Sequence, residues 1–424
     1  MAEYFNLYSN AYISALKAVN NHYKIRLELL TDEGNSIGEI TRDLSLSASG
    51  QITINYEQIT RRSCSLTLIN VENRYLPNKN SPFWLNRQFR LWLGLLVDDD
   101  IYWWSEGVYY TVSADGTGRT INIEGVDKGG ALDGTTKLNL TDSQYIYKSG
   151  TSVPTCLKDT LALNIGNVAD SIVGIAGYSG NRIVDNVLPL VDRSFWGCKL
   201  ASEITVDTNN PISEGLVKIA DLYDADIYYD RNGRLTFTPC FENSGYKYSP
   251  TLWRFTDLSS TYEDVQYTYS FDAENTITVY TNATEAGVRN VSWTAYNTNP
   301  LSPLNIGTGI RRAPHTEIPY YNVTEEQMIK DCRSAANAYL RRNSMLGMQI
   351  TFNAPIIPHL DVNNTILISD QYADIDEGVY VIQSITLPLS AAKMEISATN
   401  INWLPNDMTY KGVSEIIENN NNNE

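Results

Sequence analysis

Two stretches of this chain carry the same residue pattern about 270 positions apart. Residues 95–109 read LLVDDDIYWWSEGVY and residues 366–380 read ILISDQYADIDEGVY, and they align without a gap to the same Glu-Gly-Val-Tyr ending. In each copy an apolar run meets an acidic, turn-prone stretch, and a β-rich segment and a second alternating strand (120–126 or 394–400) follow. A chain that repeats one β-unit in this way is predicted to carry two related β-barrels or sandwiches.

Apolar and polar residues alternate in the segment that contains the first copy. Ile52, Ile54 and Tyr56 are separated by polar residues, and this period of two predicts antiparallel strands with one buried face. An aromatic content of 11%, with 28 Tyr and 8 Trp, is also typical of β-sheet protein. We therefore predict an N-terminal helix within residues 1–21 and a first β-barrel domain over residues 22–127.

The pattern changes after Lys128, where glycines interrupt the alternation and apolar residues recur at helical spacing. A helix is predicted at about 213–223, followed by the segment IYYDRNGRLTF at 227–237. Asn232 and Gly233 are suited to the two positive-φ positions of a type I′ hairpin turn. Residues 128–250 are thus predicted to form a smaller α+β insert between the two β-domains.

The strand pattern resumes after Pro250 and predicts a second β-barrel domain over residues 251–404. Thr324 and Gln327 form a capping box, which predicts one helix at 324–342 within this domain. The remaining residues, 405–424, end in ENNNNNE and are predicted to be a C-terminal tail. The expected fold class is therefore mainly β with an α+β insert.

Charge and composition narrow the possible functions of a chain of 424 residues. The net charge of −17 argues against binding that follows nucleic-acid phosphates, although DNA can pass an acidic wall without adhering to it. The five cysteines are scattered, and the three histidines lie far apart, so neither a disulfide framework nor a zinc site is predicted. The start lacks a signal peptide and no apolar run reaches the length of a membrane span, so we expect a protein that is made in the cytoplasm and does not insert into membranes.

The acidic and aromatic clusters hold the residues with the most potential for catalysis or binding. The acids at 98–100 and 370–377 suit calcium loops or glycosidase carboxylates in type, but their spacing favours solvated turns. No nucleophile motif is present, so no catalytic residue and no cofactor are predicted. Trp103 and Trp104 alternate across a predicted strand, so one of them faces outward and is a candidate subunit contact. Stacking of these tryptophans, and of Trp84 and Trp92, on sugars is the alternative.

The order of the predicted parts resembles a known family. The segment INIEGVDKGGALDG at 121–134 closes the first β-domain, and a helix leads into the hairpin of residues 216–239 before a second β-domain. This order is similar to that of the phage tail baseplate-hub family, in particular tail proteins of phages that infect Gram-positive bacteria. The similarity in order spans nearly the whole chain, and its motifs are architectural rather than catalytic.

The resemblance implies a homotrimer in which two barrels from each chain form a ring of six. Such a ring adapts a sixfold tail tube to a threefold tip and surrounds the conduit for DNA. The implied partners are the tail tube protein or a distal tail protein, and other tail-tip or fibre proteins, in a virion that is assembled in the host cytoplasm. Two alternatives stay open: a carbohydrate-binding or cell-wall-degrading tail protein, and the hub of a contractile injection device.

Overall fold

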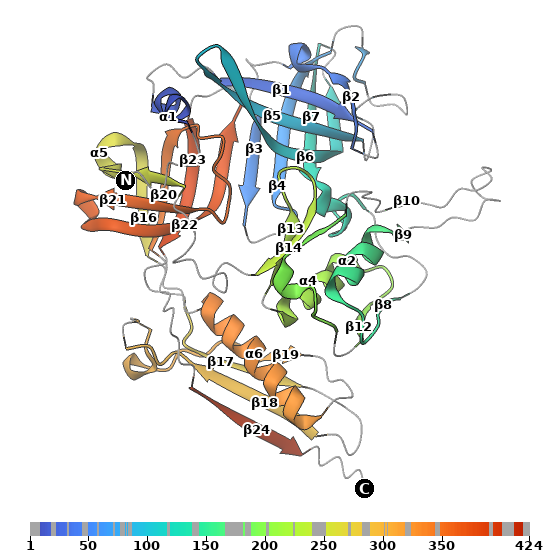
Figure 1. The fold of residues 1–424 in the computed structure, drawn as a ribbon, viewed down its shortest axis with the longest axis vertical. Helices are drawn as coiled ribbons and strands as arrows, with labels where there is room; N and C mark the ends of the chain where they lie inside the picture. The colour runs from blue at the N-terminus through green and yellow to red at the C-terminus, as the bar shows by residue number, and fades with distance from the viewer. Residues whose placement is uncertain are drawn as a thin grey trace, which may run out of the picture.

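The computed structural model contains mainly β-strands, arranged in one large sheet and several small ones (Figure 1). It describes residues 9–17, 23–31, 34–44, 50–56, 59–70, 73–76, 81, 83, 87–116, 119–137, 144–165, 181–182, 188–200, 203–223, 225–239, 252–269, 273–281, 289–300, 302, 304–318, 324–343, 348–389, 393–400 and 411–418.

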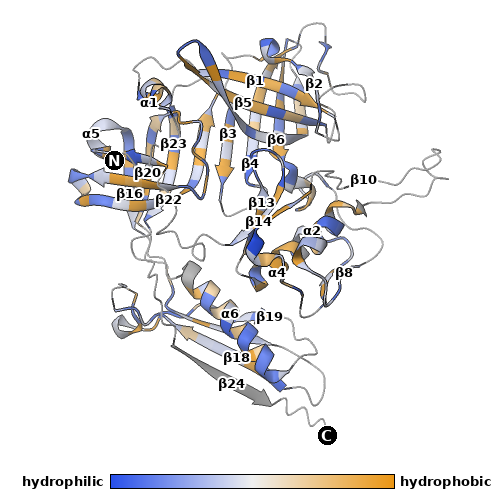
Figure 2. Cartoon of the chain, viewed as in Figure 1, coloured by the Kyte–Doolittle hydropathy of each residue, from blue (hydrophilic) through white to orange (hydrophobic). Residues whose placement is uncertain are grey.

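The large sheet contains 13 strands, and its main path runs β16-β20-β23-β22-β3-β4-β7-β6-β5-β1-β2, with β21 and β15 attached beside β22. Hydrophobic and hydrophilic residues alternate along many of these strands (Figure 2), as the period of two predicts. The strands from the N-terminal part are β1 Tyr23–Leu30, β2 Ser36–Glu39, β3 Gln51–Asn55, β4 Arg62–Ile69, β5 Gln88–Val97, β6 Asp100–Gly116 and β7 Thr120–Asp127. Those from the C-terminal part are β15 Trp253–Phe255, β16 Glu263–Tyr269, β20 Met348–Pro355, β21 Thr365–Asp370, β22 Ile375–Pro388 and β23 Lys393–Asn400.

These strands form two units with one strand order. The first sheet unit (β1 and β3 to β7) and the second sheet unit (β15, β16 and β20 to β23) each contain six strands in chain order. In space, both units run second, third, sixth, fifth, fourth, first. The units differ at the last position, because β1 pairs antiparallel with β5 whereas β15 pairs parallel with β21.

Local irregularities repeat along with the strand order. The pairing of β6 with β7 shifts at Val112, and the pairing of β22 with β23 shifts at Gln383. Both residues lie six positions after the glutamate of their Glu-Gly-Val-Tyr segment. A bulge at the same place in two strands is a feature of the fold rather than an accident of one strand. The strand order and the bulges together support the duplication that the sequence predicted.

The repeated Glu-Gly-Val-Tyr segment has a packing reason. A Cβ built on Gly107 would lie 2.6 Å from the Tyr109 ring, and one built on Gly378 would lie 2.8 Å from the Tyr380 ring. Both tyrosines are buried, so in each unit the ring folds back over a glycine that cannot carry a side chain. The tyrosine fills the space that the missing side chain leaves.

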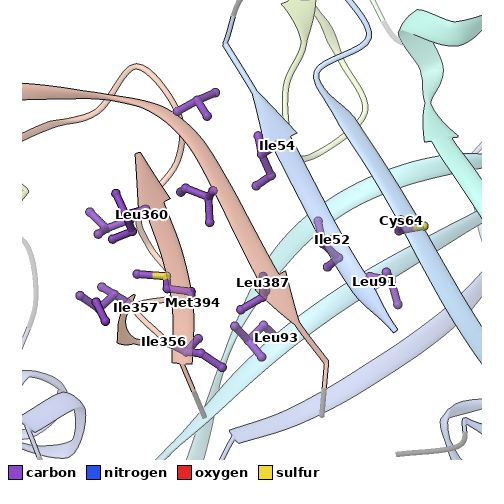
Figure 3. Close-up of a cluster of buried hydrophobic side chains, with 14 of the residues drawn as sticks. Ile52, Ile54, Cys64, Leu91, Leu93, Ile356, Ile357, Leu360, Leu387 and Met394 are labelled. Atoms are coloured by element: carbon purple, nitrogen blue, oxygen red, sulfur yellow. The ribbon is translucent and has the colours of Figure 1, made fainter. Parts of the chain in front are cut away.

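The two units are joined into one sheet rather than closed into two barrels, which corrects the prediction of separate barrel or sandwich domains. Ser384–Pro388 of β22 pair antiparallel with β3, and no closed ring of strands occurs among the described residues. Buried residues of both units also form one hydrophobic core (Figure 3), in which Ile52 lies opposite Leu387. Periodicity identifies which residues face the core, but it does not identify which strand edges pair.

The insert, residues 128–239, has its own hydrophobic core beside the first unit. It contains the three-stranded sheet β11-β14-β13 and the pair β12-β8. The sequence prediction of an α+β insert covered residues 128–250. Residues 240–250 of that prediction lie outside the described residues. The elements of the insert are η3 Lys128–Ala131, β8 Tyr145–Tyr147, α2 Val153–Leu161, β9 Asn164–Ile165, β10 Asn181–Arg182, β11 Leu190–Val191, η4 Arg193–Phe195, β12 Ile204–Val206, α4 Ser213–Leu222, β13 Ala225–Tyr229 and β14 Leu235–Pro239.

A separate helix–sheet domain lies at the other end of the molecule (Figure 1). Its helix α6, Glu325–Asn343, was predicted at 324–342, and Gln327 N–H donates to the Thr324 hydroxyl as the capping box required. The Gln327 side chain does not reach back, because it donates to Asp331 instead. The other elements of the domain are β17 Thr276–Thr281, β18 Arg289–Tyr296, η6 Ile306–Thr308, β19 Thr316–Ile318 and β24 Lys411–Glu418.

This domain differs from the predicted organisation of the C-terminal part. Helix α6 packs on β17 and β18 with a core of its own, whereas the sequence assigned the helix to the second β-barrel. Strand β24 pairs with β18 along residues 411–418, within the stretch 405–424 that was expected to be a tail. A strand contributed from a distant part of the chain is not visible in a local residue pattern. The last described short elements are α1 Asn10–Lys17, η1 Thr41–Asp43, α5 Leu258–Thr261 and η7 Gln371–Ala373.

Candidate functional site

A polar junction joins the first sheet unit, the insert and the second sheet unit around Arg62. Arg62 is the first residue of β4, and its side chain is buried, with only 1% of it exposed. Its guanidinium donates to the Tyr229 carbonyl at 3.1 Å and forms an ion pair with Asp361. One arginine from the first unit therefore contacts the insert and the second unit.

The hairpin tip of the insert reaches the same place. Arg231 donates to the Pro358 and Leu360 carbonyls at 3.0 and 2.9 Å, and its Nε lies 3.4 Å from the Asp361 carboxylate. The Arg231 carbonyl in turn accepts from the Ser105 hydroxyl at 2.6 Å. The tip is thus bonded to one unit through its side chain and to the other through its backbone.

The hairpin turn at this tip differs from the predicted type I′ turn. Gly233 has a positive φ of 76°, but Asn232 is not among the positive-φ residues. The Asp230 carboxylate accepts the backbone N–H groups of Asn232 and Arg234, both at 2.9 Å. An aspartate at the first position favours this side-chain-stabilised turn, so the local pattern Asp-Arg-Asn-Gly selects a turn with a single left-handed glycine.

A second contact between the first unit and the insert involves Arg61. Its guanidinium pairs with Asp226 at 2.5 Å and lies over the Tyr228 ring at 3.6 Å. The Arg61 side chain is 2% exposed. Pairing and ring contact together compensate the cost of burying the arginine.

The carboxylates of the junction are in two electrostatic states. Burial opposes the charge on Asp361, but Arg62 and Arg231 lower its pKa below the ordinary value. Burial raises the pKa of Glu106 to about 7, and it also raises the pKa of Asp127 to about 7 although backbone N–H groups oppose the shift. Glu106 Oε1 has no hydrogen-bond partner among the described residues. The junction therefore holds one firmly charged carboxylate and two that titrate near neutrality.

These carboxylates do not form a hydrolytic site of the glycosidase kind. Asp361 is held by two arginines, and Asp127 accepts the N–H groups of Arg62 and Gly129 at 2.8 Å. Glu106 is only 4% exposed, so a sugar cannot reach it unless the polar junction opens. A pair of catalytic carboxylates needs a cleft between them. The chemistry of this cluster is that of an interdomain clamp.

Helix α1 forms a second tie across the two sheet units. Tyr12 packs against Trp104 of β6, with ring centroids 4.9 Å apart, and its hydroxyl lies 2.8 Å from His359 Nδ1 of the second unit. Burial lowers the pKa of His359 to about 4, so this histidine is neutral at pH 7. The helix predicted within residues 1–21 thus bridges the units, and Trp104 belongs to that bridge.

Trp103 lies on the opposite face of β6 from Trp104, as their alternation predicted. It packs over Gly94, and the Arg26 guanidinium lies 4.9 Å from its ring centroid. Arg26 also lies 4.6 Å from the ring of Trp92 on the neighbouring strand. Trp103 is half-buried rather than fully exposed. Trp104 packs against the main hydrophobic core, and Trp103 is not among the residues that do so, which leaves Trp103 as the tryptophan on the outer face.

The acidic segments of the two repeats occupy turns and caps. Asp98, with a positive φ of 54°, lies in the turn between β5 and β6. Asp370 caps η7 and accepts the hydroxyls of Ser259 and Tyr267. No group of three metal-ligating side chains occurs in the described part of the chain. Within the same residues, no helix has both the length and the apolar character of a membrane span.

The fold is similar to that of phage tail proteins. The tail protein from Neisseria meningitidis MC58 aligns with a TM-score of 0.55 at 12% identity, over 90% of this chain and 98% of that one. The 43 kDa tail protein of prophage MuSo2 from Shewanella oneidensis aligns with a TM-score of 0.52 at 12% identity, over 90% and 98%. Prophage tail protein gp18 from Listeria monocytogenes EGD-e aligns with a TM-score of 0.50 at 11% identity, over 91% and 95%.

Comparison of sequences does not detect these relationships. No family profile matches the chain, and no curated protein matches it. At identities of 11–12% the likeness concerns the fold, which this chain shares with phage tail proteins over nearly its whole length. The three source bacteria differ widely, so the Gram-positive host implied by the resemblance stays a prediction.

Proposed function

We propose that this protein is the structural hub of a phage tail tip and that three copies form a ring of six sheet units. The fold shared with phage tail proteins supports a structural role in the tail. The observation that carries the proposal is the common strand order of the two sheet units, with equivalent bulges at Val112 and Gln383. Three chains with two like units each have the parts for pseudo-sixfold symmetry.

Such a ring suits the contact between a sixfold tail tube and a threefold tip. Head-to-tail contacts close into a ring only if the rotation from each unit to the next is fixed. Within one chain, three contacts fix the rotation between the two units: the β3–β22 pairing, the Arg62–Asp361 ion pair and the α1 bridge. In this proposal the polar junction sets the angle between neighbouring units.

The proposed partners follow from this position in the tail. One face of the ring binds the tail tube protein or a distal tail protein, and the other binds tail-tip or fibre proteins. DNA passes through the opening without specific binding, since a net charge of −17 disfavours adhesion to phosphates. Trp103, with its half-buried ring under Arg26, is the candidate contact to a neighbouring protein. The site of action is the virion, after assembly in the host cytoplasm.

The mass of the purified protein in solution tests the proposal. A hub is expected at about three times the chain mass of 47.6 kDa across the micromolar range. A monomer over that whole range would contradict the hub. Incubation with purified bacterial cell wall tests the alternative role, and release of soluble sugar or peptide would favour the degrading tail protein.

A further inference from the structure

The contact between the two sheet units uses one half of a long strand. Residues 375–381 of β22 pair with β21, and Ser384–Pro388 continue past the end of β21 to pair with β3. Gln383, the bulged residue, separates the two halves. The C-terminal half of β22, the fifth strand of the second unit, thus pairs with β3, the second strand of the first unit.

In the equivalent strand of the first unit, β6, the same half has no partner strand on this side among the described residues. Strand β6 pairs with β5 up to Tyr110, the bulge follows at Val112, and Ser113–Gly116 pair with β7 on one side. No described strand pairs with Ser113–Gly116 on the other side. These residues are half-buried or exposed. Their free edge corresponds to the edge that binds β3 in the second unit.

The strand that would fit this edge is β16, whose outer side is not paired with any strand that the structure describes. In the second unit, β16 occupies the place of β3: Tyr267 and Tyr269 oppose β20 as Ile52 and Ile54 oppose β4. Strand β16 ends the large sheet among the described strands. Tyr269 is 60% exposed, whereas its equivalent, Ile54, is 2% exposed because β22 covers it.

We propose that β16 of one chain pairs antiparallel with Ser113–Gly116 of β6 in the next chain, an inference that rests on the proposed trimer. The register of β22 with β3 carries over to this contact. Ile385 opposite Ile54 predicts Ala114 opposite Tyr269, and Leu387 opposite Ile52 predicts Gly116 opposite Tyr267. The occupant of each edge is therefore a second copy of this chain.

The side chains at the contact fit this arrangement. Ala114 and Gly116 are small, so they leave room for the two tyrosines, where Ile385 and Leu387 face isoleucines inside the chain. Pairing also satisfies backbone groups that each edge otherwise exposes, and it covers the apolar ring of Tyr269. Each chain gives one edge and receives one, so the contact repeats around a closed ring of three.

A designed disulfide tests the contact and its register. In the double variant Ala114→Cys/Tyr269→Cys, the two thiols face each other across directly opposed positions of neighbouring chains. Mild oxidation is expected to produce covalent dimers and trimers on a non-reducing gel. The matched control is Asp115→Cys/Tyr269→Cys, in which the thiols leave on opposite faces of the sheet and cross-linking is expected to be weak. Each single cysteine variant shows the background from native thiols.

The mass of the unoxidised double variant separates the two proposals. If the variant is a trimer but oxidation forms no cross-links, the proposed strand pairing is wrong and the trimeric hub stands. The same holds if the variant and its control cross-link equally. A monomer at all concentrations overturns both.

A charge on the same edge gives a second test. Tyr269→Lys is expected to move the assembly midpoint to about tenfold higher protein concentration, because a lysine at an edge strand opposes pairing. Tyr372→Lys changes a tyrosine that is 83% exposed in η7 and is expected to leave the midpoint unchanged. An unchanged midpoint for Tyr269→Lys, with the fold retained by circular dichroism, contradicts the pairing.

Discussion

The two sheet units share a strand order but differ in how they use the glutamate of the repeated segment. Glu106 in the first unit is buried in the polar junction, whereas its equivalent Glu377 is 55% exposed and pairs with Arg254 at 2.8 Å. In both units the glycine and tyrosine of the segment make the same packing contact. The glutamate, in contrast, is in a different electrostatic environment in each unit. Duplication preserves the packing of the unit, and the surroundings of each copy decide the chemistry of its polar residues.

The largest expected effect comes from breaking the junction that only the first copy forms. Arg62→Leu leaves Asp361 with one arginine instead of two and removes the bond to the Tyr229 carbonyl. We expect a loss of about 3–5 kcal/mol in the free energy of unfolding, measured by urea denaturation. Arg74→Leu is the control, because Arg74 is half-exposed beside Asp43, and its expected loss is below about 1 kcal/mol. Equal losses would show that Arg62 does not clamp the units.

The next largest effect is a difference between the two equivalent glutamates in how the free energy of unfolding depends on pH. The folded-state pKa of Glu106, about 7, lies above the ordinary value of 4.5, so the folded protein binds this proton more tightly than the unfolded chain. The resulting stability is complete below pH 4.5 and is lost as the pH rises through 7. Glu106→Gln keeps the side chain neutral and should stabilise the protein at pH 8 by about 3 kcal/mol relative to wild type, with little change at pH 4.5.

The matched variant in the other unit is Glu377→Gln. Glu377 is more than half exposed, so its loss is expected to cost less than about 1 kcal/mol at either pH. Thermal unfolding of both variants at the two pH values provides the comparison. If Glu106→Gln were as insensitive to pH as Glu377→Gln, the electrostatic difference between the units would be disproved.

A smaller effect is expected where the two units are alike. Gly107→Ala and Gly378→Ala each place a methyl group against the following tyrosine ring, at 2.6 and 2.8 Å. We expect each to destabilise the protein by about 1–3 kcal/mol, with the larger loss at Gly107, whose φ is +147°. Gly197→Ala is the control, since no atom lies within 4 Å of its added Cβ. Loss at only one of the two sites would argue that the repeat has no common packing role.

The smallest effect on folding is expected at Trp103. Trp103→Ala removes a half-buried ring beneath Arg26 and should cost the isolated chain about 1–2 kcal/mol, yet it should weaken binding to a neighbouring protein. Trp104→Ala, in contrast, removes the contact with Tyr12 and should mainly loosen α1. Native mass measurements of both variants distinguish the roles. Unchanged assembly of Trp103→Ala would reject Trp103 as an interface residue.

The sequence predicted those parts of the fold that depend on local patterns. Alternation identified the strands of both units, the Thr324 capping box identified α6, and the repeat identified the duplication. The pairing of β3 with β22 and of β18 with β24 was not predictable, because strand partners far apart in sequence leave no local signal.

The junction was also missed, and for a different reason. Arg62 begins an alternating strand and Arg231 occupies a hairpin tip, positions where an arginine is usually solvated. The burial of Arg62 and the partial burial of Arg231 depend on how the insert folds back onto the two units, which no single segment encodes. The consecutive pair Arg61-Arg62, at the start of a strand with no other charged residue, was the one signal available.

End-on electron micrographs of the purified protein test the central claim most directly. We expect a closed ring of six similar lobes with threefold symmetry and an opening of about 20 Å or more, wide enough for duplex DNA. Particles with a single pair of lobes, or a ring with another number of lobes, would contradict the claim that two like units per chain imitate a hexagon.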